Sequence, residues 1–269
     1  MNIRKLNKFF TNLFLKFNIV TSKTVDINKL KLLINLLKPI KTNHKLIRIG
    51  GKNDGGYLIP DDLENIDCLF SPGVSDVASF EQDLIKRIKG LRCFLADFSV
   101  QNSPIKHKSI NFEKKFLGSI SNEKFFTLKD WITKKTKSKN DLILQMDIEG
   151  FEYEVLINTE EKLLNRFRII VIEFHNLEKL TEEFAFKFIS AAFEKILKTH
   201  MVVHIHPNNT VKHLCRKYKG LELPSVMEFT FLRKDRIKTF TKIERFPHIL
   251  DRPCTKKRAD FILPDVWHH

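Results

Sequence analysis

The sequence predicts an α/β fold built on a mainly parallel sheet with helices on both of its faces. From about residue 66 onward, short apolar runs alternate with helical stretches, which is typical of parallel strands joined by helices. The last two strand-like runs, 201–206 and 226–233, have no obvious long helix between them, so we expect them to pair antiparallel at the sheet edge. The chain of 269 residues, 42% of them hydrophobic, is long enough for a sizeable core.

We divide the chain into three regions. Residues 1–45 form an N-terminal helical extension, 46–235 form the main domain, and 236–269 form a basic, irregular tail that we expect to pack on the domain. In the extension, residues 1–20 and the run "VDINKLKLLINLLKPI" each predict a helix, and Asp26 is placed to cap the second.

The main domain begins with a glycine-rich turn and a short strand. The strands that we then expect are the short apolar runs "DCLFSPG", "RCFLADFS", "INFEKKFLGS", "DLILQMDIEG", "RIIVIEFHNL", "MVVHIHPNN" and "VMEFTFLRKD". The helices that we expect between them are "ASFEQDLIKRIKG", "TLKDWITKKT", "EYEVLINTEEKLLN" and "TEEFAFKFISAAFEKIL". Thr127 caps the helix in "TLKDWI", which we interpret as structural.

The composition limits the classes of partner. A net charge of +15 favours polyanions such as nucleic acid, anionic lipid or charged glycans, but lysine-rich codon usage explains it equally well. The four cysteines show no C-x-x-C spacing, so we expect buried thiols in a reducing cytoplasm and neither a zinc site nor disulfides. No apolar run is long enough for a transmembrane helix, and the N-terminus lacks the cleavage site of a signal peptide.

The first predicted helix is amphipathic and basic. Its apolar residues recur at helical spacing, at Ile3, Leu6, Phe10, Leu13, Phe14 and Phe17. Such a helix can lie on an anionic membrane surface, which would make a cytoplasmic protein membrane-associated. The alternative, which we favour, is that the stripe packs against the main domain.

Acidic and polar residues follow four of the predicted strands. The polar turn "FSPGVS" ends the first strand, Asp97 follows the second, Asp147 and Glu149 the fourth, and Glu173 and His175 the fifth. In open parallel sheets, ligands bind at the carboxyl ends of the strands. A helix cap would explain Asp147 alone but not the whole series, so the sequence predicts a binding site at this edge.

The turn "SPGVSDVASFE" after the first strand indicates the kind of cofactor. Gly73 allows a tight turn that brings backbone N–H groups near a ligand. The three glycines of a dinucleotide-binding turn and the G-K-[ST] of a P-loop are both missing, which disfavours a pyrophosphate. Asp97 is placed to accept hydrogen bonds from a ribose diol. A nucleoside cofactor without pyrophosphate fits, and S-adenosylmethionine is the common one.

An ordered set of motifs resembles the FkbM-type family of S-adenosylmethionine-dependent methyltransferases. The set covers about residues 45–235 and consists of "NDGGYLIPDDL", "SPGVSDVASFE", "FLADFS", "LQMDIEGFEYEVL", "IVIEFHNL", "HIHPNN" and "LPSVMEFTFLRK". The most specific piece is "MDIEGFEYEVL", which is close to the family's D-I-E-G-x-E. The resemblance implies a class I methyltransferase (Rossmann-like) sheet of seven strands, the last two forming an antiparallel hairpin. It also implies methyl transfer, usually to a hydroxyl of a sugar or secondary metabolite.

The cofactor site expected from the turn and the resemblance comprises Asp54, Tyr57, Ser71, Gly73, Val74, Ser75, Glu81, Asp97, Phe98 and Ser119. Two of these positions depart from the family pattern. Ser71 stands where most members carry an acid that helps to hold the cofactor's amino group, and Ser75 stands where they carry a second glycine. Glu81, at the start of the next helix, is a candidate substitute for that acid.

The expected catalytic residues are Asp147, Glu149, Glu173 and His175. His175 is the preferred general base because the reference pKa of histidine is about 6.5. Asp147 and Glu173, on adjacent strands, are candidate Mg²⁺ ligands, although we consider metal dependence the less favoured alternative. The residues that we expect to bind sugar hydroxyls, or alternatively to be satisfied within the sheet, are His204, His206, Asn208 and Asn209.

The sequence therefore predicts an O-methyltransferase acting on a sugar or glycan in surface-polysaccharide or glycolipid biosynthesis. An RNA methyltransferase is the first alternative, suggested by the charge. The sequence has no RNA-binding motif, which makes a nucleic-acid partner unlikely. The second alternative, suggested by Ser71, is a non-catalytic module that kept the fold. The sequence does not determine the oligomeric state.

Overall fold

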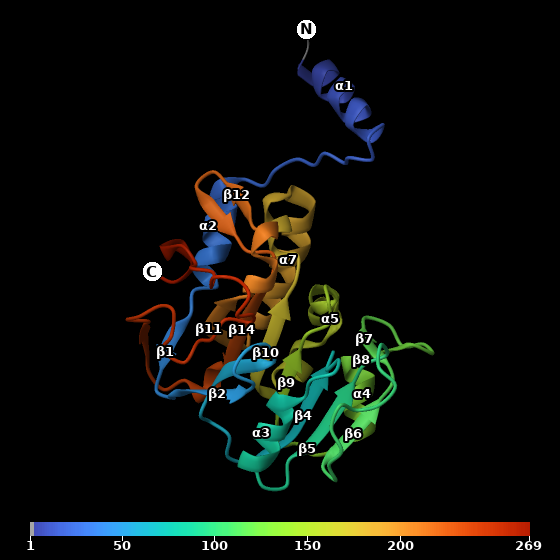
Figure 1. Ribbon diagram of the computed structural model, residues 1–269, viewed down its shortest axis with the longest axis vertical. Coiled ribbons are helices and arrows are strands. Elements are labelled where there is room, and N and C mark those ends of the chain that lie inside the picture. The colour runs from blue at the N-terminus through green and yellow to red at the C-terminus, as the bar shows by residue number, and fades with distance from the viewer. Residues whose placement is uncertain (1–2) are drawn as a thin grey trace.

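The computed structural model of the protein describes residues 3–269, with the side chains of 3–7 and 212 outside that description. A twisted sheet of seven strands runs through the molecule (Figure 1). In spatial order its strands are β11 (His200–Pro207), β14 (Met227–Arg233), β10 (Phe167–Phe174), β9 (Asp141–Met146), β4 (Ile66–Pro72), β5 (Arg92–Ala96) and β6 (Ile110–Glu113).

The strand directions confirm the expected architecture. The pairs formed among β10, β9, β4, β5 and β6 are parallel, whereas β14 pairs antiparallel with both β10 and β11. The last strand of this sheet in sequence order, β14, is thus inserted between β10 and the edge strand β11. The carboxyl ends of the parallel strands consequently lie along one edge, as the placement of the predicted site requires.

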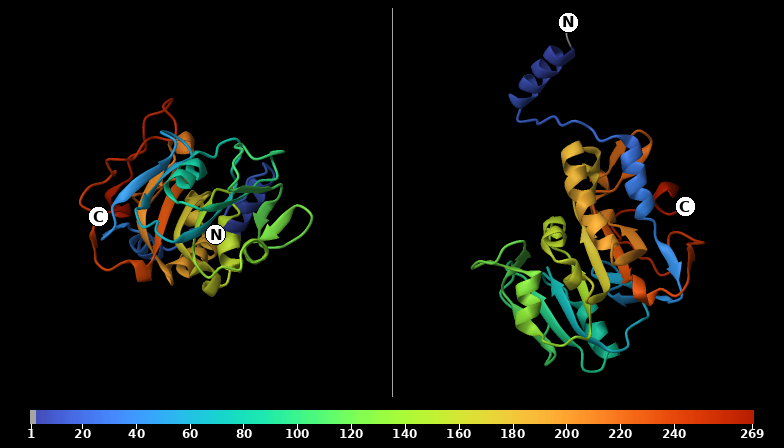
Figure 2. Two further views of the ribbon diagram at one scale, coloured as in Figure 1. Left: turned by 90° about the horizontal axis from the view of Figure 1, so that it is seen from below. Right: turned by 180° about the vertical axis from the view of Figure 1, so that it is seen from behind.

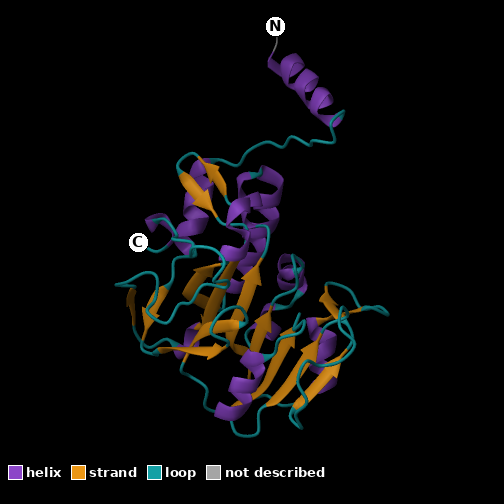
Figure 3. Cartoon of the chain, viewed as in Figure 1, coloured by secondary structure: helices purple, strands orange, loops and turns teal. Residues whose placement is uncertain are grey.

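Helices and a hairpin cover the two faces (Figure 3). The helices are α2 (Ile27–Leu36), α3 (Ser79–Arg87), α4 (Leu128–Lys135), α5 (Glu152–Asn158), α6 (Glu161–Leu164) and α7 (Glu183–Leu197). One core cluster joins the sheet to α2, α4, α5 and α7, and the other joins it to α3 and the hairpin of β2 (Leu46–Gly50) and β3 (Gly56–Pro60). Each face of the sheet is therefore buried, which explains why its strands are apolar on both sides.

Several local expectations need correction. The segment 152–165, expected as one helix, is divided into α5 and α6 because Thr159 and Glu160 adopt extended backbone conformations. The glycine-rich turn at 46–63 lies between two strands rather than beside one. The run "INFEKKFLGS" forms β6 and then the separate β7 (Phe116–Gly118), which pairs with β8 (Phe125–Thr127).

The segments that flank the main domain also contribute to its core. Asp26 caps α2 as predicted, accepting hydrogen bonds from the backbone N–H groups of Asn28 and Lys29. Leu30 and Ile34 of α2, and Trp267 of the tail, are fully buried in the cluster that contains the sheet. In the tail, β15 (Phe240–Lys242) pairs with β1 (Ile40–Thr42). The remaining elements are β12 (Arg216–Tyr218), β13 (Leu221–Leu223) and the 3₁₀ turns Leu177–Thr181, Asn209–Leu214, Lys234–Arg236 and Asp265–Trp267.

Helix α1 (Ile3–Leu15) stands clear of the sheet and its covering helices in Figure 1 and in the right-hand view of Figure 2. Its described apolar side chains are exposed, including Phe10, Leu13 and Phe14, and so is Phe17 beyond it. The prediction that this stripe packs on the domain is therefore wrong for these residues, while the side chains of Ile3 and Leu6 lie outside the description. Among the described residues, no helix is both long enough and apolar enough to cross a membrane.

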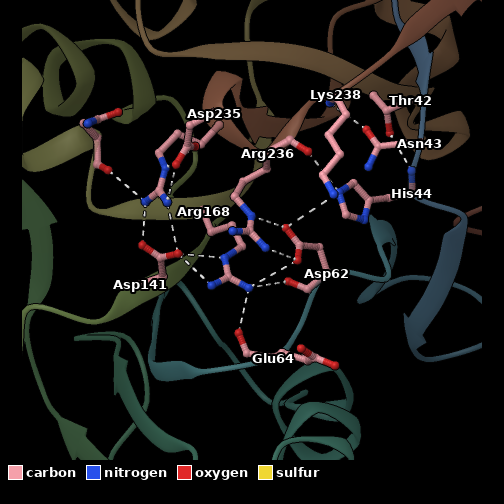
Figure 4. A network of polar contacts seen from close by, with 12 residues as sticks. Thr42, Asn43, His44, Asp62, Glu64, Asp141, Arg168, Asp235, Arg236 and Lys238 are labelled. Atoms are coloured by element: carbon pink, nitrogen blue, oxygen red, sulfur yellow. Dashed lines mark hydrogen bonds and ion pairs between the residues drawn. The ribbon is translucent and has the colours of Figure 1, made fainter.

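An ion-pair network connects strands β9, β10 and β14 at the edge of the sheet opposite the predicted site (Figure 4). Asp141 at the start of β9 accepts hydrogen bonds from Arg168 of β10 at 2.8 Å and from Arg233 of β14 at 2.6 Å. Asp62 pairs with Arg168 and, at 2.7 Å, with Arg236. Arg168 is buried, and bidentate contacts to carboxylates offset the cost of burying its charge. The network fixes the amino ends of β9 and β10 against the end of β14.

Candidate active site

The turn after β4 approaches the end of β9 so closely that only glycine fits. Gly73 has a φ of 82°, and a Cβ at this position would lie 1.6 Å from the carbonyl oxygen of Asp147. Backbone hydrogen bonds hold the approach, from Gly73 N to Ala96 O at 2.8 Å and from Asp147 N to Pro72 O at 3.3 Å. The two strand ends named by the sequence are thus in direct contact.

A cavity of about 190 Å³ opens beside this turn. Seven of the predicted site residues line it, namely Asp54, Tyr57, Gly73, Val74, Ser75, Glu81 and Asp147. The lining residues that were not predicted as site residues are Gly55, Val77, Ser79, Phe80 and Gln145. Gln145 could have been identified from the sequence, because it places an amide within the apolar run 142–146 of strand β9.

Ser71 lies behind this cavity and joins two of its lining residues. Its hydroxyl contacts the carboxyl of Glu81 and lies 2.5 Å from Oε1 of Gln145. All three side chains are buried, and burial raises the pKa of Glu81 above its ordinary value. The structure therefore brings together the serine that departs from the family pattern and the glutamate expected to replace its acid.

The predicted ribose ligand, Asp97, shapes the glycine turn. Its Oδ2 accepts the backbone N–H of Ser75 at 2.9 Å, and its Oδ1 accepts the N–H and hydroxyl of Ser99 at 2.7 and 2.6 Å. Asp97 is buried and is not among the residues that line the cavity. Each carboxylate oxygen has more than one acceptor direction, so these bonds leave capacity for a ligand.

Two further predicted cofactor residues lie away from the cavity lining. Phe98 packs against Phe116, with ring centroids 5.3 Å apart. Ser119 donates its backbone N–H to Glu154 at 3.3 Å and accepts from Asn158 at 2.9 Å. Ser119 thus anchors the segment after β7 to α5, and contact with the cofactor stays a prediction for both residues.

The four predicted catalytic residues do meet, and His175 is their centre. Its Nε2 lies 3.4 Å from a carboxylate oxygen of Glu149 and 3.8 Å from oxygens of both Asp147 and Glu173. Its Nδ1 lies 3.1 Å from Oε1 of Glu152, a fully buried residue.

Glu152 was not among the site residues predicted from the sequence, although it belongs to the motif "MDIEGFEYEVL". Glu152 is the last acid of "DIEGFE", and its Oε1 also accepts the backbone N–H groups of Ile148 and Gly150 at 3.2 and 3.0 Å. One carboxylate thus holds both the turn after β9 and the imidazole of His175. The spacing of the motif could have identified Glu152, because a glutamate at this position can fold back onto the turn that precedes its helix.

The surroundings of these residues shift their pKa values, and the shifts change the catalytic roles expected for them. Burial alone would lower the pKa of His175, but the hydrogen bond and charge of Glu152, with the charges of Glu173 and Asp147, raise it to about 9. Burial raises the pKa of Asp147 to about 7, against the opposing charge of His175. Burial and the charge of Asp147 also raise the pKa of Glu173. At neutral pH His175 is therefore protonated, which does not support the preference for His175 as the base.

The candidate metal ligands differ from the expected pair. Ligand atoms of Asp147, Glu149 and His175 all lie within 4.8 Å of one another, whereas Glu173 is not part of that group. A set that includes an imidazole is less typical of Mg²⁺, which prefers oxygen ligands.

The four predicted sugar-binding residues are buried beneath the C-terminal tail. His204 Nε2 lies 2.9 Å from Oδ1 of Asp251, and Asn208 donates to Glu173 at 3.1 Å. Asn209 donates to the carbonyls of Thr255 and Arg258 and accepts the N–H of Thr255. His206 faces Glu228, with Nδ1 3.7 Å from Oε2. Because groups of the protein contact His204, Asn208 and Asn209, the alternative of residues satisfied within the fold describes these three better. Contact with a sugar stays a prediction for all four residues.

The sheet order, the antiparallel last strand and the glycine turn that meets acids at the strand ends define a class I methyltransferase fold. A family model described as "Methyltransferase FkbM domain" matches residues 46–199, more than half of the chain. The protein therefore belongs to the FkbM methyltransferase family, and this membership implies S-adenosylmethionine as the methyl donor.

The solved structures to which the chain is similar are distant. A fibrillarin pre-rRNA processing protein of Methanococcus jannaschii is 10% identical with a TM-score of 0.37, over 79% of this chain and 83% of its own. Precorrin-6y C5,15-methyltransferase of Geobacter metallireducens is 10% identical with a TM-score of 0.33, over 62% and 79%. TrmN of Thermus thermophilus is 6% identical with a TM-score of 0.32, over 62% and 44%. No curated protein sequence matches the chain significantly.

Proposed function

We propose that this methyltransferase transfers a methyl group from S-adenosylmethionine to a hydroxyl of a sugar or glycan. The observation that supports the proposal is that one carboxylate oxygen of Asp147 lacks a hydrogen bond within the described part of the chain. Its Oδ1 is buried, has no hydrogen-bond donor among the described residues, and belongs to a side chain that lines the cavity. An acceptor hydroxyl would supply the missing donor. The raised pKa of Asp147, about 7, suits a general base that works near neutral pH.

The residues present fit the methyl donor. The backbone of the turn at Gly73 lines the cavity, and Glu81 offers a carboxyl there for the amino group. When bound, the donor supplies an electrophilic methyl group on a sulfonium. Asp54, Tyr57 and Ser75 would complete its surroundings.

A carboxylate of the chain itself would accept the proton of the acceptor hydroxyl. The hydroxyl proton of the acceptor would pass to Oδ1 of Asp147 as the acceptor oxygen took the methyl group that the donor supplies, with the electron pair of the broken carbon–sulfur bond left on sulfur. His175, protonated and held by Glu152 at 3.1 Å, keeps positive charge beside that carboxylate and limits further rise of its pKa. This mechanism needs no cation. If EDTA abolished activity and Mg²⁺ restored it, the group of Asp147, Glu149 and His175 would be assigned to a metal instead.

A labelling experiment tests the acceptor class. Full-length protein is incubated with tritiated S-adenosylmethionine and, separately, with glycolipid, polysaccharide and RNA fractions. We expect label in a glycan fraction and at least an approximately hundredfold lower kcat for Asp147→Asn, with donor affinity little changed. Label in RNA alone would favour the alternative function. Failure to bind S-adenosylhomocysteine in a calorimetric titration would indicate a non-catalytic module.

We also propose that α1 places the enzyme on an anionic membrane. Its described apolar side chains are exposed beside Lys8 and Lys16, and the first acidic residue of the chain is Asp26. An exposed apolar stripe with only basic charges around it is complementary to anionic lipid. Removal of residues 1–20 should abolish sedimentation with anionic vesicles and leave activity on a soluble acceptor intact. Equal sedimentation of both proteins, or equal binding to neutral vesicles, would contradict this.

A further inference from the structure

A second cluster of polar side chains lies outside the cavity, where the tail crosses the sheet edge. His206 of β11 and Glu228 of β14 are direct partners across the two strands, and Cys254 of the tail lies against them. Nδ1 of His206 is 3.7 Å from Oε2 of Glu228, and Sγ of Cys254 is 3.6 Å from Oε1 of the same residue. One ligand atom from each lies within 4.8 Å of the others, and all three residues are buried.

These separations are those of ligands around one small cation. Ligands at about 2.0–2.3 Å from a tetrahedral zinc ion stand roughly 3.3–3.8 Å apart. The separation of 3.6 Å, a hydrogen bond from the thiol of Cys254 to Oε1 of Glu228, and that of 3.7 Å, from His206 to Oε2, fall in that range. A thiol, an imidazole and a carboxyl also form a donor set typical of zinc, and three protein ligands leave one tetrahedral position open.

Among the described residues, few other groups form hydrogen bonds with these three side chains. Nε2 of His206, the ring nitrogen other than the one that faces Glu228, is buried and has no hydrogen-bond partner among the described residues, and Oδ1 of Asp260 is 3.9 Å from it. The cation that acts on Glu228, Arg48, gives its hydrogen bonds to the carbonyls of Gly51 and Asn53.

We propose that His206, Glu228 and Cys254 bind a zinc ion that fastens the C-terminal tail to the sheet. A thiolate and a carboxylate together balance the two charges of the ion, so the filled site is neutral and suited to its buried position. The site lies beyond the function proposed above and does not depend on it. The cysteine spacing did not indicate such a site, because the proposed ligands come from three separate segments.

The surrounding contacts indicate what the ion would hold in place. Asn209 bonds the tail at Thr255 and Arg258, and Asp251 of the tail bonds His204. Glu228 is also the strand partner of Glu173, which belongs to the active-site cluster. Fastening Cys254 to Glu228 would therefore fix the tail beside the active site.

Cobalt and zinc titrations of the full-length protein test the proposal. Protein stripped of metal under reducing conditions is titrated with Co²⁺, whose thiolate complex has a distinctive charge-transfer absorption, and then with Zn²⁺. We expect one equivalent of Co²⁺ to give this absorption and Zn²⁺ to displace it. The group of Asp147, Glu149 and His175 contains no sulfur and cannot produce the signal.

Cys215 offers a matched control, because its Sγ also lies 3.6 Å from a glutamate oxygen, that of Glu222. Cys254→Ser should abolish the absorption, whereas Cys215→Ser should retain it. His206→Gln should weaken zinc binding about a hundredfold or more, since loss of even an outer partner costs 10–100-fold. The His206 variant also serves if Cys254→Ser does not fold.

Limited proteolysis provides a readout of the tail. Zn²⁺ should slow cleavage after the basic residues 256–258 in the wild type and in Cys215→Ser, but not in His206→Gln. Absence of the thiolate absorption, its loss in Cys215→Ser, or zinc binding unchanged in His206→Gln would each overturn the proposal.

Discussion

Nδ1 of His175 lies 3.1 Å from Oε1 of Glu152, and solvent does not reach that carboxylate. The pair joins the end of β10 to the turn after β9, where Asp147 begins the motif that Glu152 completes. Because Glu152 is buried, its charge acts on His175 with little screening by water. The imidazole is thereby held in its protonated form close to the proposed base.

The first prediction concerns Glu152→Gln. The substitution keeps the size of the side chain and removes the charge, so the pKa of His175, now about 9, should fall by at least about one unit. NMR titration of the imidazole measures this. Glu154→Gln on the same helix is the control and should leave the value unchanged. An unaltered pKa in Glu152→Gln would mean that Asp147 and Glu173 determine the charge of His175.

The second prediction is a bell-shaped dependence of kcat/KM on pH. Asp147 must be deprotonated to accept a proton, so activity should rise with pH through about 7. His175 must stay protonated, so activity should fall again through about 9. The two limbs report the interacting group as a whole, and initial rates from pH 5.5 to 10 measure them. A profile without the lower limb would remove Asp147 from the role of base, and Glu149→Gln should keep both limbs.

The third prediction compares Gly73→Ala with Gly90→Ala. The two glycines have φ values of 82° and 81°, so the left-handed backbone costs alanine about 1–2 kcal/mol at either position. Only at Gly73 would the new Cβ meet a backbone oxygen, at 1.6 Å, while nothing lies within 4 Å at Gly90. Gly73→Ala should therefore lower Tm by roughly 5–10 °C more than Gly90→Ala. Thermal unfolding followed by circular dichroism measures the difference, and equal Tm values would refute the close approach of the two turns.

The fourth prediction concerns Glu81, the proposed partner of the donor's amino group. Glu81→Gln should weaken binding of S-adenosylhomocysteine about tenfold to a hundredfold, because a charge-assisted hydrogen bond contributes roughly 1.5–3 kcal/mol. Calorimetric titration measures the affinity, with the exposed Glu123→Gln as control. Affinity within about twofold of the wild type would leave the amino group without an assigned partner and return Glu81 to a structural role with Ser71.

The sequence by itself determined the strand ends and the residues placed there. Asp147, Glu149, Glu173 and His175 meet because parallel strands bring their carboxyl ends to one edge, and alternation of strands and helices is a local pattern. The glycine turn at Gly73 was predictable for the same reason, since a sharp turn between a strand and a helix favours glycine at that point.

Only the tertiary structure decided how these groups are charged and what covers their neighbours. The pKa of His175 depends on burial and on Glu152, and neither effect can be read from the reference value of histidine. His206, Glu228 and Cys254 come together because the tail folds back over β11 and β14, a long-range packing that spacing along the chain does not encode. Similarly, the apolar stripe of α1 fits a domain surface or a lipid surface equally well, and its exposure here is a property of the folded chain.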